Sequence, residues 1–504
     1  MKTKLLLLAF LLSFTAKAQD GILDTSFGTN GTMDLSFFSD FVDMKTDYYG
    51  KVVALGKNTS GIPILVRFNS DGSLDTTFDS DGIKEIDFGN TDETPASFCI
   101  FDNGTGWGYL VTSSKSGKIA RILDNGSFSS TFGTNGIYTY SASSNPISFV
   151  NYDWENYKII ICQSNSDYFS STGGTIYRLN PNGTPDTTFN NGNPVNFYFN
   201  SSIVIPTSIQ SDGEGSIYIS GYYATTSYIC VAKFTTAGTR VWSYNPSATG
   251  NTVPGYFIDA VDNTSYSFGS SWSESVDQMT VRKHNAAGNG LDTSFGTNGS
   301  AFITVPNAYY ANIKSIAGQY SDDDFKIIIA GRSREQSSSA MANITVARLN
   351  SDGSLDTSFG TNGITSVPTN LSSYTLHVAS AIDYETGKLY IMGKTGEASA
   401  GRQSQQSTLT TVPVSLSKLN LSSLLSVSDI TKNIITIYPN PTQNILHFSQ
   451  PLKEITVYDL SGKLIKTQKE LSEKLNVNDL PKGIYILSGV DKSGNKFNQK
   501  FVKN

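Results

Sequence analysis

The sequence predicts an all-β protein, a seven-bladed β-propeller followed by a small β-sandwich, and two observations lead to that prediction. The first is a unit of the form Leu-Asp-x-x-Phe-Gly-x-x-Gly that returns along most of the chain. The second is that short β-branched and aromatic runs, without helical periodicity, fill the space between its copies. A repeat of this kind determines the architecture before any catalytic motif is considered.

Each copy of the unit is expected to have the same local structure. It follows an apolar strand that ends in Arg or Lys and an Asn-x-x-Gly turn, as in Asn69 to Gly72, where Gly takes a positive φ. Leu74 and Phe78 are then apolar anchors, and Asp75 between them is expected to cap the local backbone turn. The copies are Leu23 to Gly31, Leu74 to Gly82, Phe128 to Gly136, Pro185 to Gly192, Leu291 to Gly299 and Leu355 to Gly363, with a worn copy at Gly238 to Tyr244.

The number of blades follows from counting these units. The aromatic residue of each copy gives seven markers: Phe27, Phe78, Phe132, Phe189, Tyr244, Phe295 and Phe359. About four short strands fit each period, the content of a propeller blade. The first unit has no strands before it and the last period has no unit after it. Pairing the N-terminal unit and the strand after it with the last blade would close the ring and protect both sheet edges. A linear or curved β-solenoid is the alternative.

The two ends of the chain differ from the repeat region. Residues 1–18 are predicted to be a secretory signal peptide, with Lys2 and Lys4 before an apolar run and Ala16-Lys17-Ala18 before the cleavage site. The repeat domain is then 19–424. Residues 425–504 have their own strand rhythm, contain Lys but no Arg, and are predicted to form a compact antiparallel sandwich. No apolar run of 18 residues follows the signal peptide, so no transmembrane segment is expected in the mature chain.

Charge and cysteine content exclude several classes of protein. Without the signal peptide, 34 basic residues face 43 acidic ones. This acidic balance argues against a nucleic-acid partner, which would require a basic surface. Cys99, Cys162 and Cys230 lie singly within strand-like runs, so buried free thiols are expected and a disulfide framework is not. One Cys162–Cys230 bridge stays open as an alternative.

Two family resemblances rest on these motifs. The repeated units resemble the delta-60 repeats of bacterial surface and secreted proteins, a family that implies no defined activity. The tail resembles the C-terminal sorting domain of the type IX secretion system of Bacteroidetes. That resemblance implies transit through the periplasm, export by the type IX secretion machinery, and a final place outside the cell or on the outer-membrane surface. The residues that carry it are Tyr438, Pro439, Asn440 and Pro441, then Gly462 and Lys463 after a strand, then Gly483 and Tyr485, and finally Lys500 to Lys503.

Catalytic and metal signatures are absent from the sequence. The three histidines are isolated, and no His-Glu-x-x-His, Cys-x-x-Cys, Gly-x-Ser-x-Gly or Walker pattern occurs. No metal site or cofactor is therefore predicted. Calcium is the alternative at Asp79 to Gly82 and Asn69 to Gly72, because Ca²⁺ requires several oxygens from one tight turn. At the position of Asp79 to Gly82, most other copies of the unit carry Gly-Thr-Asn-Gly, which has no carboxylate.

Binding is the function that the repeat favours. In a propeller the loops between second and third strands share one face with the connections between blades, and variable loops on a rigid scaffold commonly carry recognition. The sequence therefore predicts non-enzymatic binding of a glycan or a surface protein on that face. A polysaccharide-degrading hydrolase or lyase at the same place, and a structural envelope or adhesion component, are the alternatives. The predicted ligand-binding residues are Tyr168, Tyr222, Tyr223, Trp272, Arg332, Arg334 and Arg402.

Overall fold

A computed structural model describes most of the chain from Asp20 onward. The predicted signal peptide lies outside the described residues. Those residues are 20–47, 49–89, 93–102, 106–141, 148–164, 173–199, 204–223, 229–244, 251–258, 264–273, 276–285, 290–320, 325–335, 342–367, 375–383, 386–396, 414–421, 437–438, 442–459, 463–490 and 496–503.

The chain forms two compact units that divide between Leu425 and Ser426. The described part of the first unit contains seven four-stranded antiparallel sheets and one short 3-10 turn, η1 (Asn190–Gly192). We number the sheets as blades 1 to 7 by the order of their innermost strands. Those strands are β2 (Phe38–Thr46), β6 (Pro95–Asp102), β10 (Ser148–Asp153), β14 (Val204–Ser211), β18 (Asn251–Ile258), β22 (Tyr310–Tyr320) and β26 (Thr375–Asp383).

The remaining three strands of each blade follow outward in chain order. The second strands are β3 (Val52–Asn58), β7 (Trp107–Ser113), β11 (Lys158–Ser164), β15 (Ile217–Tyr223), β19 (Ser265–Ser273), β23 (Phe325–Arg334) and β27 (Lys388–Gly396). The third strands are β4 (Pro63–Phe68), β8 (Lys118–Leu123), β12 (Gly173–Leu179), β16 (Ile229–Phe234), β20 (Val276–His284), β24 (Asn343–Asn350) and β28 (Val414–Asn420). The outer strands are β5 (Ile83–Glu85), β9 (Ile137–Thr139), β13 (Val195–Tyr198), β17 (Arg240–Tyr244), β21 (Ser300–Ile303), β25 (Ile364–Val367) and, for blade 7, β1 (Thr32–Asp34).

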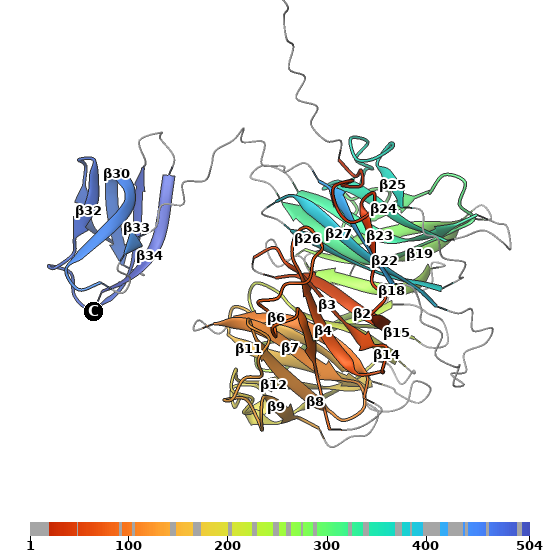
Figure 1. Ribbon diagram of the computed structural model, residues 1–504, viewed down its shortest axis with the longest axis horizontal. Helices are drawn as coiled ribbons and strands as arrows, with labels where there is room; N and C mark the ends of the chain where they lie inside the picture. The colour runs from red at the N-terminus through yellow and green to blue at the C-terminus, as the bar shows by residue number, and fades with distance from the viewer. Residues whose placement is uncertain are drawn as a thin grey trace, which may run out of the picture. The chain divides into compact units, whose positions relative to one another are not determined.

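The blades are arranged in a ring. Each innermost strand packs against the innermost strand of the next blade, and β26 packs against β2 (Figure 1). This arrangement is a β-propeller, consistent with the seven blades predicted from the repeat, and it excludes the open solenoid.

The N-terminal strand supplies the outer strand of the last blade. Thr32 of β1 pairs with Ser417 of β28, and Asp34 pairs with Ser415. Just before β1, the Asp24 N–H donates a hydrogen bond of 2.8 Å to the Lys418 carbonyl oxygen. Blade 7 therefore joins residues from both ends of the propeller unit.

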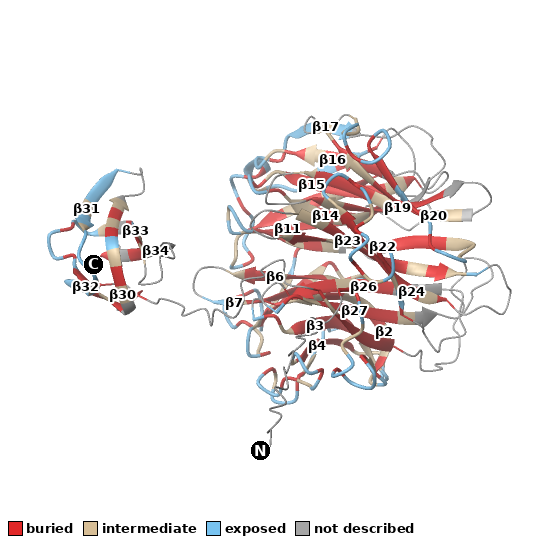
Figure 2. Ribbon diagram, turned by 90° about the horizontal axis from the view of Figure 1, so that it is seen from above, coloured by how far each residue is buried: buried red, intermediate tan, exposed pale blue. Residues whose placement is uncertain are grey.

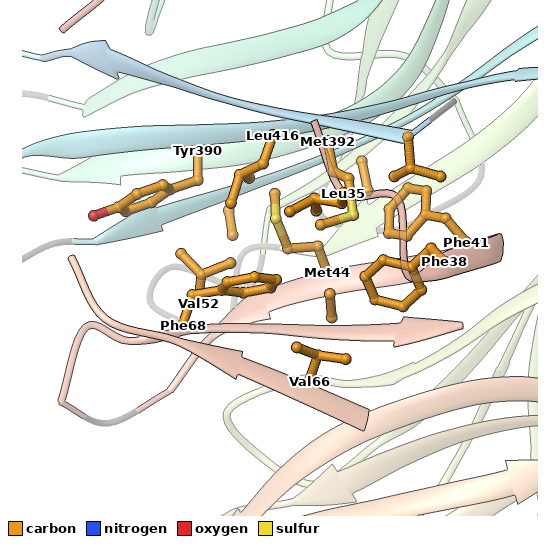
Figure 3. Close-up of a cluster of buried hydrophobic side chains, with 14 of the residues drawn as sticks. Leu35, Phe38, Phe41, Met44, Val52, Val66, Phe68, Tyr390, Met392 and Leu416 are labelled. Atoms are coloured by element: carbon orange, nitrogen blue, oxygen red, sulfur yellow. The ribbon is translucent and has the colours of Figure 1, made fainter. Parts of the chain in front are cut away.

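Buried apolar side chains of neighbouring blades form shared clusters, and buried residues run along most of the blade strands (Figure 2). Between blades 1 and 7, Phe38 and Met44 of β2 meet Tyr390 and Met392 of β27 in one buried cluster (Figure 3). The phenylalanine of the repeated unit also belongs to these cores. Its copies Phe27, Phe78, Phe132, Phe189, Phe295 and Phe359 are each at most 1% exposed.

The glycine of the Asn-x-x-Gly turn is explained by this phenylalanine. Gly72 of blade 1 has φ 91°, and a Cβ placed there would lie 2.8 Å from the Phe27 ring. Gly353 of blade 6 has φ 85° and meets the Phe295 ring at 3.0 Å in the same way. Both the positive φ and the close approach to an aromatic ring favour glycine, so this turn locks one blade onto the unit that precedes it.

The aspartate of the unit caps its turn as expected, and it also forms an ion pair with the arginine of the preceding strand. The Asp75 carboxylate accepts a hydrogen bond of 3.1 Å from the Thr77 N–H. It also accepts one of 2.7 Å from Nε of Arg67, the buried arginine that ends β4. Arg348 and Asp356 repeat the pair at 2.8 Å. The sequence pattern therefore contains an ion pair that lies between the end of the third strand and the unit.

The worn copy in blade 4 differs from the alignment proposed above. Tyr244 was matched to the buried phenylalanines, but it lies within β17 and pairs with Val231 of β16. In the other blades the phenylalanine precedes the outer strand. Matching Tyr244 to it is therefore wrong: this copy forms the outer strand directly, without the loop of the unit.

All three cysteines are free and buried. The Cys162–Cys230 bridge is therefore absent, although both residues belong to one apolar cluster. Burial raises the pKa of the Cys99 thiol to about 12, which makes it unreactive at neutral pH.

The second unit is a small β-sandwich. Its long strand β30 bends at Glu454, where φ is 53°, and pairs with different strands before and after the bend. Tyr485 is buried, stacks on Phe501 at 5.5 Å and donates a hydrogen bond to the Pro481 carbonyl oxygen. The strands are β29 (Ile437–Tyr438), β30 (Ile445–Asp459), β31 (Leu464–Gln468), β32 (Ser472–Asn476), β33 (Gly483–Val490) and β34 (Lys496–Lys503). Pro439, Asn440, Pro441 and Gly462 lie outside the described residues.

Candidate ligand site on the propeller axis

A cavity of about 330 Å³ lies among the innermost strands. Six of the seven strands contribute to its described lining: β2, β6, β10, β14, β22 and β26. Because the lining comes from strands around the ring, the cavity lies on the axis of the propeller. Its volume is at the lower end of the range for ligand-binding pockets in proteins.

β-Bulges direct individual side chains into this cavity. The strand register shifts once at Val42, once at Ala96, once at Thr207 and once at Lys314, and all four residues line the cavity. A bulge inserts one extra residue and re-aims its side chain. These four innermost strands therefore share one structural device, and blade 6 uses it to present a cation.

Lys314 is the unusual residue of this set. It is half-buried, and within the described part of the chain its ammonium has neither an ion pair nor a hydrogen bond. Burial and, to a smaller extent, the positive charge of Arg332 lower the pKa of Lys314 to about 8. A partly desolvated cation without a counter-charge is costly, so an anion bound beside it would be stabilising.

Arg332 extends the positive charge outward from the cavity. Its guanidinium lies 4.7 Å from the centre of the Tyr310 ring and donates a hydrogen bond of 2.7 Å to the Tyr310 hydroxyl. Asp277 of blade 5 lies close enough for Arg332 to act on it: burial raises the pKa of Asp277, and the arginine opposes that rise. Arg334 follows at the end of β23, where its carbonyl accepts a hydrogen bond from the Tyr309 N–H.

The rest of the cavity is polar but electrically balanced. The one carboxylate among its described lining residues, Asp43, forms an ion pair of 2.7 Å with Lys45. Ser315 of β22 and Ser380 of β26 share a hydrogen bond of 2.7 Å. Hydroxyl groups near Lys314 could orient an oxygen-rich ligand without adding charge.

The predicted ligand-binding residues are not all brought together. Tyr222 and Tyr223 end β15, Trp272 lies near the end of β19, and Arg332 and Arg334 end β23, on the face where the innermost strands begin. We call this side the loop-rich face. Tyr222 is half-buried, but Tyr223 is only 5% exposed and packs in an apolar cluster. Tyr168, Arg402 and the Trp272 side chain are outside the described residues.

Lys314 was missed in the sequence. It is a single lysine within the run Ala311 to Ala317, and alternation alone does not show which way a bulged residue points. The signal that could have found it is a charged residue at the centre of an innermost strand, a position where most of the other blades carry apolar or hydroxyl side chains.

The turns considered for calcium use their carboxylates internally. Asp81 accepts a hydrogen bond from the Ile83 N–H, Asp79 pairs with Lys84, and Asp71 accepts one from the Ser73 N–H. Within the described residues no group of three or more histidines, cysteines or acidic residues is placed to hold a metal ion. Among those same residues, no helix has the length and apolar character needed to span a bilayer.

Comparisons with known proteins agree with this architecture. The family described as "Secretion system C-terminal sorting domain" matches residues 436–504. The family described as "Domain of unknown function (DUF5122) beta-propeller" matches residues 50–78, 158–189 and 326–359. These three segments each begin within two residues of the start of a blade's second strand and end at the buried phenylalanine of the unit. No curated protein matches the chain.

Solved structures resemble the chain only distantly. PorZ, a surface component of the type IX secretion system of Porphyromonas gingivalis, is 9% identical with a TM-score of 0.21, over 92% of this chain and 81% of PorZ. The polysaccharide lyase Uly1 is 11% identical with a TM-score of 0.37, over 77% of this chain and 99% of Uly1. Prolyl oligopeptidase B from Galerina marginata is 9% identical with a TM-score of 0.41, over 91% and 56%.

The family matches and the fold together identify the parts of the molecule. The sorting domain indicates export to the cell surface or into the medium. The delta-60 name and the signal peptide stay predictions. The chain is a β-propeller protein that carries a C-terminal sorting domain of the type IX secretion system.

Proposed function

We propose that the exported propeller binds an anionic glycan at the axial cavity without cleaving it. The single observation that carries this proposal is Lys314, a half-buried cation that a β-bulge directs into the cavity and that has no counter-charge within the described residues. A carboxylate or sulfate group of a sugar would supply that charge.

The surroundings of Lys314 favour a sugar over a simple ion. A charge-assisted hydrogen bond is stronger than a neutral one and gains strength away from bulk water. Arg332 places a second cation close enough to lower the pKa of Lys314. The hydroxyls of Ser315, Ser97 and Thr207 add partners for sugar oxygens. The ligand that fits is an oxygen-rich chain with negative groups.

Binding without cleavage is favoured by the carboxylates near the cavity. Glycoside hydrolysis by the common mechanism needs two carboxyl groups on either side of the scissile bond. Among the described lining residues Asp43 is the one carboxylate, and it already forms an ion pair with Lys45. A hydrolase or lyase at this place remains the alternative.

The experiment measures binding of oligogalacturonate, a chain of carboxylated sugars, to the mature protein by calorimetry. Replacing Lys314 by methionine removes the charge and keeps the side-chain volume, and we expect at least 10-fold weaker binding. Lys394→Met is the matched control, because Lys394 is outside the cavity lining and already pairs with Asp40; the affinity of this variant should stay within about 2-fold of the wild type, well under the ~1.4 kcal/mol of a tenfold change. Equal binding by Lys314→Met, or release of shorter sugars, would contradict the proposal.

A further inference from the structure

Aromatic side chains are exposed on the side of the ring opposite the loop-rich face. This side carries the turns that join first and second strands, and we call it the turn face. Tyr49, in the turn of blade 1, is 61% exposed, and Trp154 and Tyr157, in the turn of blade 3, are 53% and 51% exposed. Between them in blade 2, half-buried Trp107 meets the Tyr49 ring edge-on at 5.3 Å. Three consecutive blades therefore present aromatic rings on one side.

Tyr157 adopts a backbone conformation that a bulky residue avoids. Its φ is 54°, in the left-handed region. Blade 7 has a turn of the same length, in which Gly387 takes φ 62° at the equivalent position. The two turns also share a hydrogen bond, from the Asn156 N–H to Asp153 in blade 3 and from the Thr386 N–H to Asp383 in blade 7. Blade 3 has tyrosine where the fold calls for glycine.

The fold does not explain why a tyrosine stands at position 157. Blades 1, 4 and 7 place Gly50, Gly215 and Gly387 at positive φ in their turns, with values of 70°, 77° and 62°. The Tyr157 side chain is half exposed, so burial does not repay the strain. Left-handed backbone at non-glycine residues is costly and gathers at functional sites, where the strain serves to hold a side chain in place.

The rings of Trp154 and Trp107 each pack on a buried tyrosine. Trp154 packs edge-on against Tyr152 at 5.2 Å, and Tyr152 is 1% exposed. Trp107 packs against Tyr109 at 5.6 Å, and the Arg67 guanidinium lies 5.9 Å from its ring. Exposed rings on buried aromatic supports lose little conformational freedom when a ligand stacks on them.

We propose that Tyr49, Trp107, Trp154 and Tyr157 form a second binding site, the aromatic platform, which stacks the sugar rings of an uncharged polysaccharide. The site is separate from the axial cavity, because none of these four residues lines that cavity. A ligand chain that runs across blades 1 to 3 would meet one aromatic group per blade.

The chemistry of the turns selects a neutral sugar chain. Pyranose rings present a face of C–H bonds that packs on an aromatic ring, and hydroxyls at the edge that need polar partners. The described neighbours in these turns are polar: Glu155 is an exposed carboxylate beside Trp154, and Lys158 follows Tyr157. Glu155 can accept hydrogen bonds from hydroxyls and would repel an acidic sugar. An interface for a protein would instead be expected to add exposed aliphatic side chains around its aromatic anchors, and the described residues of these two turns include none.

The test uses the mature protein in native gels that contain laminarin, xylan or glucomannan. We expect at least one of these neutral polysaccharides to retard the wild-type protein. Trp154→Ala and Tyr157→Gly should each abolish most of that retardation. Tyr198→Ala, which removes an exposed tyrosine from the outer strand β13, is the matched control and should migrate as the wild type does.

Tyr157→Gly separates a binding role from a structural one. Glycine relieves the left-handed strain, so the melting temperature should stay the same or rise while retardation is lost. A fall in melting temperature with retained retardation would assign Tyr157 to the fold and overturn the proposal. Migration of Trp154→Ala like the wild type, or absence of retardation by all three polysaccharides, would also overturn it.

The two proposed sites fail independently in these assays. Lys314→Met should leave retardation by the neutral polysaccharides unchanged, and Trp154→Ala should leave oligogalacturonate binding unchanged. Loss of both activities in either variant would contradict the assignment of two separate sites.

Discussion

Asp20 and Arg348 form an ion pair of 2.8 Å between Oδ2 and Nη1, which joins the first described residue to the third strand of blade 6. The Asp20 carbonyl also accepts a hydrogen bond of 2.7 Å from the Gly360 N–H. The next residue, Gly21, meets the buried ring of Phe359 as Gly72 meets Phe27. In other blades the glycine of the Asn-x-x-Gly turn makes this contact. In blade 7 the N-terminal segment makes it instead, because no copy of the unit follows β28.

Removing this segment should open the ring. Deletion of residues 19–38 removes β1, the ion pair with Arg348 and several buried side chains, so the melting temperature should fall markedly. Asp20→Ala alone should lower the free energy of unfolding by roughly 1–3 kcal/mol, the range for hydrogen bonds to charged groups. Thermal unfolding measures both effects. An unchanged melt after the deletion would show that the ring does not depend on β1.

Blade 2 lacks one partner of the repeated ion pair. Ser129 occupies the position of Asp75, and its N–H donates to the Arg121 carbonyl as that of Asp75 does to Arg67. Arg121 is buried over the Phe101 ring, and its Nε has no hydrogen-bond partner. Burial lowers the pKa of Arg121, as expected for a cation that has no ion pair with any described residue.

Supplying the missing carboxylate should stabilise the propeller. Ser129→Asp is expected to raise the free energy of unfolding by roughly 1–3 kcal/mol, measured by urea unfolding. The reverse change in blade 1, Asp75→Ser, leaves Arg67 with fewer partners and should lower it by roughly 3–5 kcal/mol. A less stable Ser129→Asp variant would mean that the turn of blade 2 cannot hold a second charge.

His284 should make stability depend on pH. Burial lowers the pKa of His284 to about 4, with a smaller contribution from Arg282, and its Nε2 lies 3.0 Å from the Ser267 hydroxyl. The unfolded chain takes up this proton near pH 6.5, so the contribution is complete above that pH and is lost as pH falls toward 4. The loss is on the order of 3 kcal/mol. His284→Gln should flatten unfolding curves between pH 6.5 and 4; an unaltered pH dependence would contradict the assignment.

Deleting the sorting domain should leave the propeller folded but not exported. The two units are compact by themselves, so removal of residues 438–504 is not expected to disturb the first. The truncated protein should accumulate in the periplasm, detected by fractionation and immunoblotting. Finding it in the medium at the level of the full chain would contradict the sorting function of the tail.

The period, the blade content and the place of closure followed from the sequence because each depends on a count. Asp75 and Phe78 recur in fixed positions, and a repeat that lacks its first strands must find them elsewhere in the chain. The sequence shows that an Arg or Lys and an Asp recur in most repeats. That they form an ion pair, as Arg67 and Asp75 do, is shown only by the fold.

The two proposed sites were not predictable in the same way. Lys314 faces the cavity because one extra residue shifts the strand register, and a bulge has no reliable mark in a single sequence. Tyr157 is unusual only once the left-handed turn is known. Tyr244 has the spacing of the repeated phenylalanine, but it lies in the outer strand and pairs with Val231. The copy in blade 4 preserves the length of the repeat but lacks the turn that buries the phenylalanine in the other blades.

The pH dependence of oligogalacturonate binding tests the central claim most directly. The pKa of Lys314 is about 8 because burial, and then Arg332, disfavours its charged form. The sugar carboxylates stay ionised throughout, so affinity should be constant below pH 7 and fall as pH rises through about 8. Lys314→Arg, which keeps its charge, should abolish the fall. An affinity that is independent of pH between 7 and 10, or a Lys314→Arg variant that titrates like the wild type, would show that this lysine does not hold the ligand.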